Sequence, residues 1–516
     1  MALLRSIATV GSFTMLSRIL GFIRDILIAA ILGTGLIADA FFVAFKFPNL
    51  FRRLFAEGAF NAAFVPQFTG LLESDGKLMA QFFAEQALAV LLWSVLIFVV
   101  LIQIAMPYVM LGFAPGFIGN PAQFDLAVLL TRITFPYLLF ISLASLMAGV
   151  LNSLSRFAAA AATPILLNIC LIGAVTLLAR HTPTPGHALA WGVSIAGMVQ
   201  FFWLLIHCGR AGIWLRLIRP RLTPDVRKMT RRIVPVAIGA GVYQVSLLID
   251  TIIASLLPAG SISYLFFADR VNQLPLGVVG VAVGTALLPL MSRQLRSGDE
   301  AAATASQNRA IEFSLFLTLP AAVALVVIAE PIISVLFERG AFDAISVKAT
   351  AGALAIYATG LPAYVLVKAL APGYFAREDT ATPVKIAVFA LAVNLGLNLI
   401  LMGPFKHLGI AMATSVSAWC NALILAFVLI RRGHLAFDRR LLNRTPRMIA
   451  TSLVMGGTVF YGAVALADLP GQSLISNIIA VALLVSGGLV VYGGLSLLFG
   501  AASRDDLTRI LPRKST

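Results

Sequence analysis

Charged residues inside long apolar segments are the part of this sequence with the clearest chemical meaning. A charge near the centre of a bilayer costs about 2.5–3.5 kcal/mol on insertion scales, so such residues must face a watery cavity or one another. The candidate cavity residues are Arg18, Arg24, Asp25, Asp39, Arg52, Arg53, Glu57, Asp269 and Arg270. Further charges inside apolar stretches are Lys46, Arg132, Asp250 and Lys368.

The spacing of these charges predicts one shared polar cavity. Arg18 and Asp25 are seven residues apart and therefore lie on one helix face, and Arg53 and Glu57 form an i,i+4 pair. Basic residues exceed acidic ones in the cluster, and the planar fork of arginine suits phosphate. We therefore expect an anionic, phosphate-bearing substrate. Salt bridges that only tie helices together are the alternative interpretation, chiefly for Asp25, Glu57 and Asp269.

Composition predicts that helices crossing a membrane position these charges. Of 516 residues, 60% are hydrophobic and only 12% are charged, whereas soluble domains average about 25% charged residues. Apolar runs of roughly 20 residues are long enough to span a bilayer as helix. The sequence thus predicts an all-α polytopic membrane protein with fourteen spans, at 7–32, 37–68, 82–111, 123–151, 158–179, 187–209, 230–257, 261–291, 310–337, 346–374, 382–402, 408–430, 447–467 and 473–499.

The basic residues predict the orientation of the spans. They concentrate in the N-terminus, in the loops after even-numbered spans and in the C-terminal tail, while the loops after odd-numbered spans carry only Arg180, Arg339 and Lys406, with Lys348 at the adjoining start of span 10. The positive-inside rule then places both termini in the cytoplasm. The formal net charge of +16 is explained by orientation and by contact with anionic phospholipids at loops 210–232 and 431–447, not by nucleic acid.

An internal repeat predicts two similar halves. Residues 25–35 and 250–260 are identical at five of eleven positions, at an offset of 225. Spans 1–6 and 7–12 therefore look like two copies of a six-helix unit, with a substrate site between two lobes. The expected domains are an N-lobe at 1–209, a basic linker at 210–229, a C-lobe at 230–432, a basic loop at 433–446, two additional spans at 447–500 and a cytoplasmic tail at 501–516.

The motifs that the sequence lacks favour a transporter over an enzyme. It contains no G-x-x-x-x-G-K-[ST] loop, no G-x-S-x-G and no zinc-binding pattern. We therefore predict no catalytic residues, with energy from ion gradients or membrane potential. Two other classes fit the sequence less well: a prenyl-phosphate enzyme, for which Asp505-Asp506 is the nearest metal-ligand pair, and a purely structural membrane scaffold, which would not retain so many buried charges.

Several motifs resemble the MurJ (MviN) family of the MATE-like MOP exporter superfamily. They are Ser17–Asp25, Ala38–Phe41, Pro48–Phe60, Phe64–Pro66, Asp269-Arg270 and Phe375–Pro383. The block Arg52-Arg53-Leu54-Phe55-Ala56-Glu57-Gly58-Ala59 is the most specific of them, and the resemblance covers the whole chain.

This resemblance implies a lipid II flippase. Such a protein moves the undecaprenyl-pyrophosphate-linked peptidoglycan precursor to the outer leaflet of the bacterial inner membrane. It implies that Arg18, Arg24, Arg52 and Arg270 meet the headgroup, with Asp25 and Asp39 as partners, and that spans 13 and 14 form a groove for the lipid tail. An exporter of another undecaprenyl-linked oligosaccharide and a MATE-type multidrug antiporter remain the alternatives.

The resemblance also bears on ions and partners. Some family members look able to bind Na⁺, and the matching positions are Asp250, Asn394, Asn398 and Thr414. A second carboxylate is expected where Asn398 stands, so a hydrogen-bonded Asp–Asn network is the alternative. The expected partners are lipid II, anionic membrane phospholipids and proteins of cell-wall synthesis, with no nucleic acid, and the expected state is a monomer.

Overall fold

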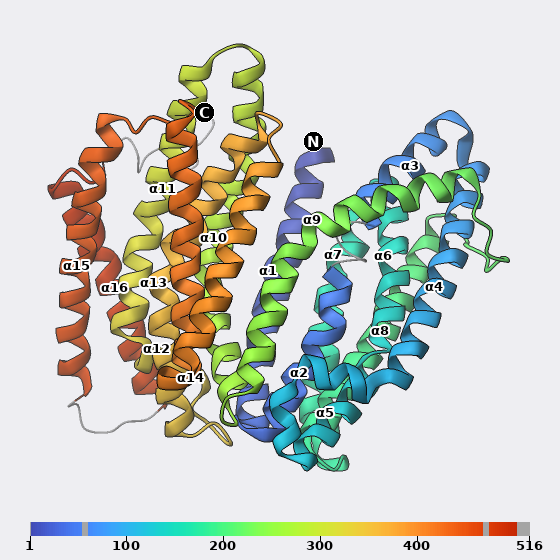
Figure 1. Ribbon diagram of the computed structural model, residues 1–516, viewed down its shortest axis with the longest axis horizontal. Coiled ribbons are helices and arrows are strands. Elements are labelled where there is room, and N and C mark those ends of the chain that lie inside the picture. The colour runs from blue at the N-terminus through green and yellow to red at the C-terminus, as the bar shows by residue number, and fades with distance from the viewer. Residues whose placement is uncertain (1, 54–59, 468–473, 503–516) are drawn as a thin grey trace. The chain divides into compact units, whose positions relative to one another are not determined.

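The computed structural model describes residues 2–53, 60–467 and 474–502 (Figure 1). Every regular element in these ranges is helical. The α-helices are α1 (Ala2–Leu32), α2 (Leu36–Phe51), α3 (Phe60–Ser74), α4 (Gly76–Phe113), α5 (Pro121–Thr134), α6 (Tyr137–Ser153), α7 (Phe157–Gly173), α8 (Pro185–Arg210), α9 (Pro224–Ser255), α10 (Ser261–Arg296), α11 (Glu300–Val327), α12 (Ala329–Phe337), α13 (Ala344–Phe375), α14 (Ala381–Arg431), α15 (Arg439–Ala467) and α16 (Leu474–Leu498). Short helical turns at η2 (Pro115–Gly119), η3 (Ala174–Leu178) and η4 (Ala179–His181) complete the set.

The chain divides into two compact units. The first comprises Met1–Ser263 together with Arg339–Phe342, and the second comprises Tyr264–Glu338 and Asp343–Thr516. This division by contact places α9 with the first unit, although the repeat would begin the second lobe at residue 230. The domain bounds expected from the sequence remain a prediction.

Aromatic packing forms much of the core of the first unit. In the unit, α1 packs on α7, α6 on α8, and α3 and α4 on α9. The ring of Phe47 lies 5.2 Å from that of Phe135 and 4.9 Å from that of Phe113, which joins α2 to α5 and to the end of α4. Phe64 of α3 stacks on Phe83 of α4 at 5.5 Å. The rings around Phe47 hold α2, with its charged residues, in a fixed position.

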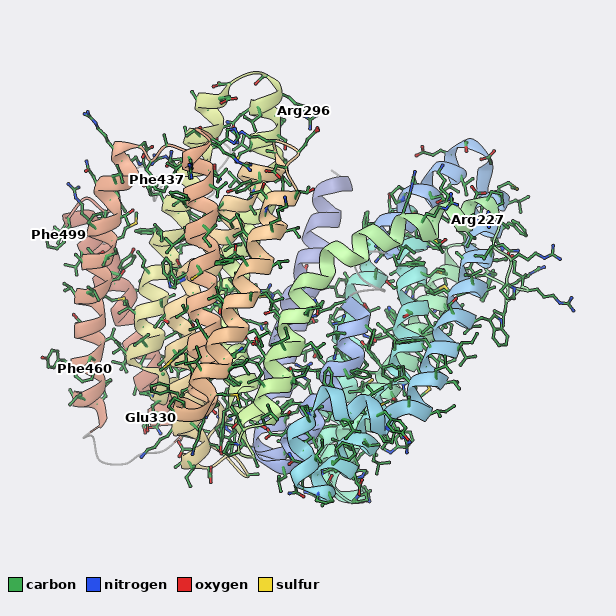
Figure 2. All side chains as sticks on the ribbon, in the orientation of Figure 1. Arg227, Arg296, Glu330, Phe437, Phe460 and Phe499 are labelled. Atoms are coloured by element: carbon green, nitrogen blue, oxygen red, sulfur yellow. The ribbon has the colours of Figure 1, made fainter. Side chains whose placement is uncertain are left out.

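In the second unit α13 is central. It packs against α11, α12 and α14, while α15 packs against α11 and α16. Figure 2 shows Arg296 and Phe437 at one end of this unit and Glu330 and Phe460 at the opposite end. Loops that follow even-numbered expected spans therefore share one end of the unit.

Membrane character is evident from the helices themselves. Among the described residues, nine helical stretches are long and apolar enough to cross a membrane. One of them is α14, a 51-residue stretch that contains a non-helical residue, Lys406, with φ 51° and ψ −130°. The break falls between expected spans 11 and 12. The described parts of the expected ranges are largely helical, with breaks at residues 135–136 and 328 inside two of them, and the number of crossings stays a prediction.

Two glycines at equivalent positions of the repeat share an unusual backbone conformation. Gly35 (φ 115°) immediately precedes α2, and Gly260 (φ 96°) immediately precedes α10. The left-handed region that both residues occupy is one that residues other than glycine rarely adopt. The two positions are 225 residues apart, the offset of the repeat. Corresponding helices thus begin in the same way in the two copies.

Candidate functional site

Arg24 and Asp25 form a buried ion pair on α1. Arg24 is 7% exposed and Asp25 is 3% exposed. The Arg24 guanidinium donates to Asp25 Oδ1 through Nη2 (2.7 Å) and Nε (3.0 Å), and through Nη1 to Asn168 Oδ1 of α7 (2.9 Å). Asn168 Nδ2 in turn donates to the Ser17 carbonyl (2.8 Å). The pair is therefore neutralised locally and bound to a second helix, which is the condition for burying charge in an apolar setting.

The remaining arginines of the first unit are more open. Arg18 is exposed and its side chain has no hydrogen bond or ion pair within the described part of the chain. Arg52 is half-buried and its Nε donates to Asn49 Oδ1 (2.9 Å). Arg53 is exposed, and Glu57 lies outside the described residues, as does the expected pair between them.

Asp39 of α2 caps the start of α10. Its two carboxylate oxygens accept from the Gly260 N–H (2.6 Å), the Ser263 N–H (2.8 Å) and the Ser263 hydroxyl (2.5 Å), and all three residues belong to the first unit. Asp39 is 2% exposed. A carboxylate at a helix N-terminus is stabilised by the unpaired N–H groups and by the helix dipole. Both carboxylate oxygens of Asp39, which was expected to accompany the substrate-binding arginines, therefore already accept hydrogen bonds from the protein.

A second contact links α2 to α9. Lys46 Nζ donates to Thr251 Oγ1 (3.2 Å). Asp250, the neighbour of Thr251, is half-buried. The seven-residue spacing of Asp39 and Lys46 therefore places two polar contacts along one helix, both directed at residues between 251 and 263.

In the second unit Arg270 and Asp269 lie on α10. The Arg270 guanidinium stacks 4.8 Å from the centroid of the Phe266 ring, a cation–π geometry. Asp269 accepts from the Gln273 side chain one turn later. Arg270 is half-buried, so its guanidinium is oriented by the ring while part of it stays accessible.

Lys368 of α13 is a further cation in this unit. A Cβ added at Gly280 of α10 would come within 2.9 Å of Lys368 Nζ, so the ammonium lies against the α10 backbone. Within the described part of the chain its side chain makes no hydrogen bond or ion pair. The second unit therefore contributes a cation for which the described residues supply no counter-charge.

The residues expected to hold Na⁺ are divided between the units. Asp250 belongs to the first unit, and Asn394, Asn398 and Thr414 belong to the second. Asn398 Nδ2 donates to Asn394 Oδ1 (3.0 Å), and the Thr414 hydroxyl donates to the Ile410 carbonyl (2.8 Å). In the second unit these three residues offer neutral oxygens, and the sodium site stays a prediction. The described residues contain no cluster of three or more His, Cys, Asp or Glu suited to a metal.

The Phe375–Pro383 motif connects the end of α13 to the start of α14. Asp379 accepts from the Thr382 N–H (2.9 Å) and from Arg432 Nη1 (2.6 Å). The side-chain hydrogen bond with Thr382 is the largest cause that lowers the pKa of Asp379 to about 2, followed by the Thr382 backbone bond and Arg432. The motif therefore joins the start of α14 to its end.

One site residue, Asn168, was not predicted from the sequence. It is 4% exposed and lies in an apolar helix, and its side chain joins Arg24 to the backbone of α1. Polar residues inside a membrane helix are uncommon and often bond across helices. That rarity is the signal that could have identified it.

Comparison with known proteins assigns the chain to a family. A family profile described as "Lipid II flippase MurJ" matches residues 28–477. The chain is 44% identical over 520 residues to the "Probable lipid II flippase MurJ" of Rhizobium tropici, covering 100% of this chain and 97% of that protein. It is 36% identical over 468 residues to the "Lipid II flippase MurJ" of Burkholderia cenocepacia, covering 90% and 91%.

Solved structures give the same fold. A structure titled "Lipid II flippase MurJ, inward closed conformation" matches with a TM-score of 0.80 and 26% identity, over 97% of this chain and 99% of that one. An inward-facing MATE multidrug transporter matches with a TM-score of 0.63 and 13% identity, over 82% and 97%. That second likeness concerns the fold alone. With the family profile and two relatives matched over nearly the whole chain, this integral membrane protein belongs to the MurJ family.

Proposed function

We propose that this protein moves lipid II from the cytoplasmic to the periplasmic leaflet of the bacterial inner membrane. The observation that carries the proposal is the match to lipid II flippases, over residues 28–477 for the family profile and over 100% of this chain and 97% of a relative at 44% identity. Buried and half-buried arginines, which a phosphate-bearing substrate requires, support it from the site.

The arginines and their acidic partners bind the pyrophosphate headgroup in this proposal. Arg18 is exposed without a described partner, and the Arg270 guanidinium is oriented by the ring of Phe266. Arg24 is held by Asp25 and Asn168, so it can act as a fixed donor with little loss of side-chain entropy on binding. Lys368 adds a cation without a described partner in the second unit.

The outer face of α15 and α16 is suited to the polyprenyl tail. Large apolar side chains are exposed on both helices, including Tyr461 at 75% and Val490 at 74%. Gly487, Gly493 and Gly494 of α16 face open space, whereas a Cβ at Gly456 would meet Val323 at 2.4 Å. Gly456 therefore serves close packing, and the three α16 glycines leave a smooth apolar strip that a lipid chain can follow.

Alternating access would carry the headgroup outward, with the expected lobes as moving parts. The positive-inside pattern places both termini in the cytoplasm. A potential that is negative inside favours outward movement of an anion by about 2.3 kcal/mol per charge per 100 mV. Coupling to the membrane potential therefore requires no bound ion.

Depletion in living cells tests the proposal. The amount of lipid II that an externally added cleaving enzyme can reach is measured before and after depletion. We expect exposure to fall while lipid II accumulates inside, because the headgroup cannot cross unaided. Unchanged exposure would contradict the proposal and would favour another undecaprenyl-linked glycan as the cargo.

A further inference from the structure

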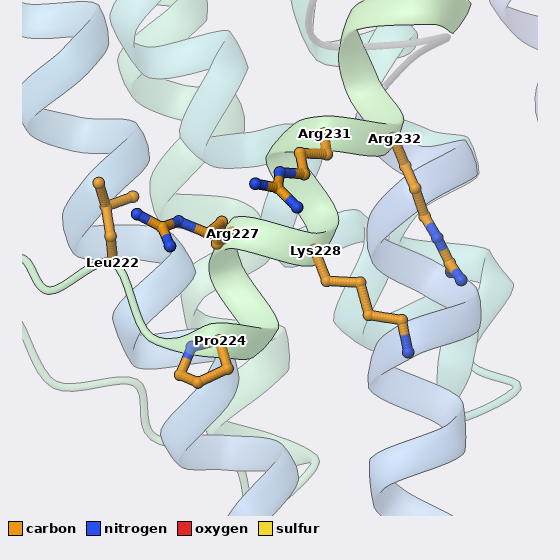
Figure 3. Close-up of a pocket in the computed structure, with 6 residues that line it drawn as sticks. All are labelled: Leu222, Pro224, Arg227, Lys228, Arg231 and Arg232. Atoms are coloured by element: carbon orange, nitrogen blue, oxygen red, sulfur yellow. The ribbon is translucent and has the colours of Figure 1, made fainter.

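A pocket on the first unit gathers four cations at the start of α9. The pocket has a volume of about 470 Å³ and is lined by Leu222, Pro224, Arg227, Lys228, Arg231 and Arg232. Figure 3 shows Arg227 and Arg231 directed to one side of the helix and Lys228 and Arg232 to the other. Each pair is spaced i,i+4, and like charges at this spacing are destabilising. Within the described part of the chain none of the four side chains has a hydrogen bond or ion pair.

A second pocket adjoins the first through shared residues. Its volume is about 290 Å³, and Lys228 and Arg232 line it together with Gln67 and Asp225. Gln67 of α3 is 9% exposed, its Nε2 donates to the Asp225 carbonyl (2.8 Å), and its Oε1 has no partner among the described residues. This pocket therefore places two cations beside the Asp225 carboxylate, and Gln67 ties the start of α9 to α3.

The pockets are built on a fixed backbone. Val226 and Met229 are buried on the opposite face of α9, and the linker before the helix is bound to α4. Glu85 Oε1 accepts from the Arg216 N–H (3.1 Å), and Gln86 Oε1 accepts from the Arg221 N–H (3.1 Å). The cations are consequently presented on a docked segment and not on a loose loop.

We propose that these pockets form a binding site for a phosphate ester of a lipid, distinct from the arginine cavity. Lys228 and Arg232 bind the phosphate oxygens. Arg227 and Arg231 raise the positive electrostatic potential of the pocket and make further contacts with the ligand. The Asp225 carboxylate also lines the second pocket and can accept a hydrogen bond from a hydroxyl of the headgroup. Two sources share this chemistry: a phospholipid such as phosphatidylglycerol, and a polyprenyl pyrophosphate. The second source rests on the proposed function, and the first does not.

Binding of defined lipids to the full-length protein in detergent tests the site. Lys228→Ala/Arg232→Ala is compared with wild type by native mass spectrometry, using phosphatidylglycerol and undecaprenyl pyrophosphate as probes. We expect roughly tenfold weaker binding of one or both lipids, because two charge-assisted contacts are lost. Lys228→Arg/Arg232→Lys, which keeps both charges, should bind like wild type.

Arg293→Ala/Arg296→Ala is the matched control, because both residues are exposed near the basic end of α10 and lack described partners. Loss for phosphatidylglycerol alone would identify a phospholipid site, and loss for the pyrophosphate alone would identify a site for the polyprenyl headgroup. Equal binding by the Lys228/Arg232 variant and this control, for both lipids, would overturn the proposal. The readout needs no flipping, so that result would leave the proposed transport untouched.

Discussion

The two basic segments of this protein, at the start of α9 and around the start of α15, are both rich in arginine but have different surroundings. Near α15, Glu312 is 5% exposed and accepts from Arg309, from Arg440 (3.1 Å) and from Arg444 (2.6 Å). Arg309 also pairs with Asp438. At α9 the four cations have no described acidic partner.

With the proposed lipid site at α9, the same residue type would serve two purposes in one chain. At α15 a buried acid gathers arginines and fastens the helix to α11, so the apolar strip of α15 and α16 moves with the second unit. At α9 the charges are left for a ligand. A structural cluster should therefore lose stability when altered, whereas a binding cluster should lose affinity.

The largest expected effect is that of Glu312→Gln. The change leaves three guanidinium groups around a neutral side chain, and we expect the free energy of unfolding in detergent to fall by about 2–3 kcal/mol. Glu330→Gln, on exposed Glu330, is the control and should change stability little. Equal stability of the two variants would refute a fastening role for Glu312.

Arg444→Ala against Arg231→Ala compares the two segments directly. The Arg444 side chain is 15% exposed and donates to Glu312, while Arg231 is exposed without a described partner. Removing Arg444 should cost about 1–2 kcal/mol of unfolding free energy, and removing Arg231 close to nothing. Similar losses of unfolding free energy for the two variants in denaturation experiments would contradict the distinction between the segments.

Low pH should reduce the stability of the second unit, which contains the basic segment near α15. Hydrogen bonds from Thr382, and then Arg432, lower the pKa of Asp379 to about 2, from about 3.9 in an unfolded chain. A lowered folded-state pKa stabilises the fold above pH about 4, and this contribution is lost as pH falls toward 2. Asp379→Asn should remove that part of the pH dependence of thermal unfolding. Parallel pH profiles of thermal unfolding for the wild-type protein and the variant would contradict this expectation.

The smallest expected effect has the opposite sign. Lys228→Glu replaces a repulsive i,i+4 pair with an attractive pairing of a glutamate and Arg232, so stability should rise by about 0.2–0.5 kcal/mol while phosphate binding falls. Thermal unfolding and lipid binding on the same sample check both parts. A clear loss of stability would mean that Lys228 has a structural role.

The helices could be predicted from the sequence because apolar length is a local property. The expected spans are largely helical where described, and the break at Lys406 falls between spans 11 and 12. Partner choice is not local. Asp39 meets Ser263, which is 224 residues away, and Glu312 meets Arg444 at a separation of 132. Both basic segments were therefore expected to contact lipid headgroups alike, and only packing distinguishes them.

Arg24 and Arg270 also differ in how cleanly they test transport. Arg24→Ala would leave Asp25 buried without the guanidinium and would detach Asn168, so it combines a structural loss with a functional one. Arg270 is half-buried over the ring of Phe266, so its replacement alters a less buried part of the structure than that of Arg24. Arg270→Ala is therefore the sharper variant.

The most direct test of the central claim is the exposure of lipid II in cells that depend on Arg270→Ala. The fraction cleaved by an enzyme added from outside is measured beside wild type and Arg293→Ala, with equal amounts of each protein in the membrane. Arginine capture predicts that lipid II stays inside with Arg270→Ala and reaches the outer leaflet with the other two. Wild-type exposure with Arg270→Ala would contradict capture of the pyrophosphate by this arginine.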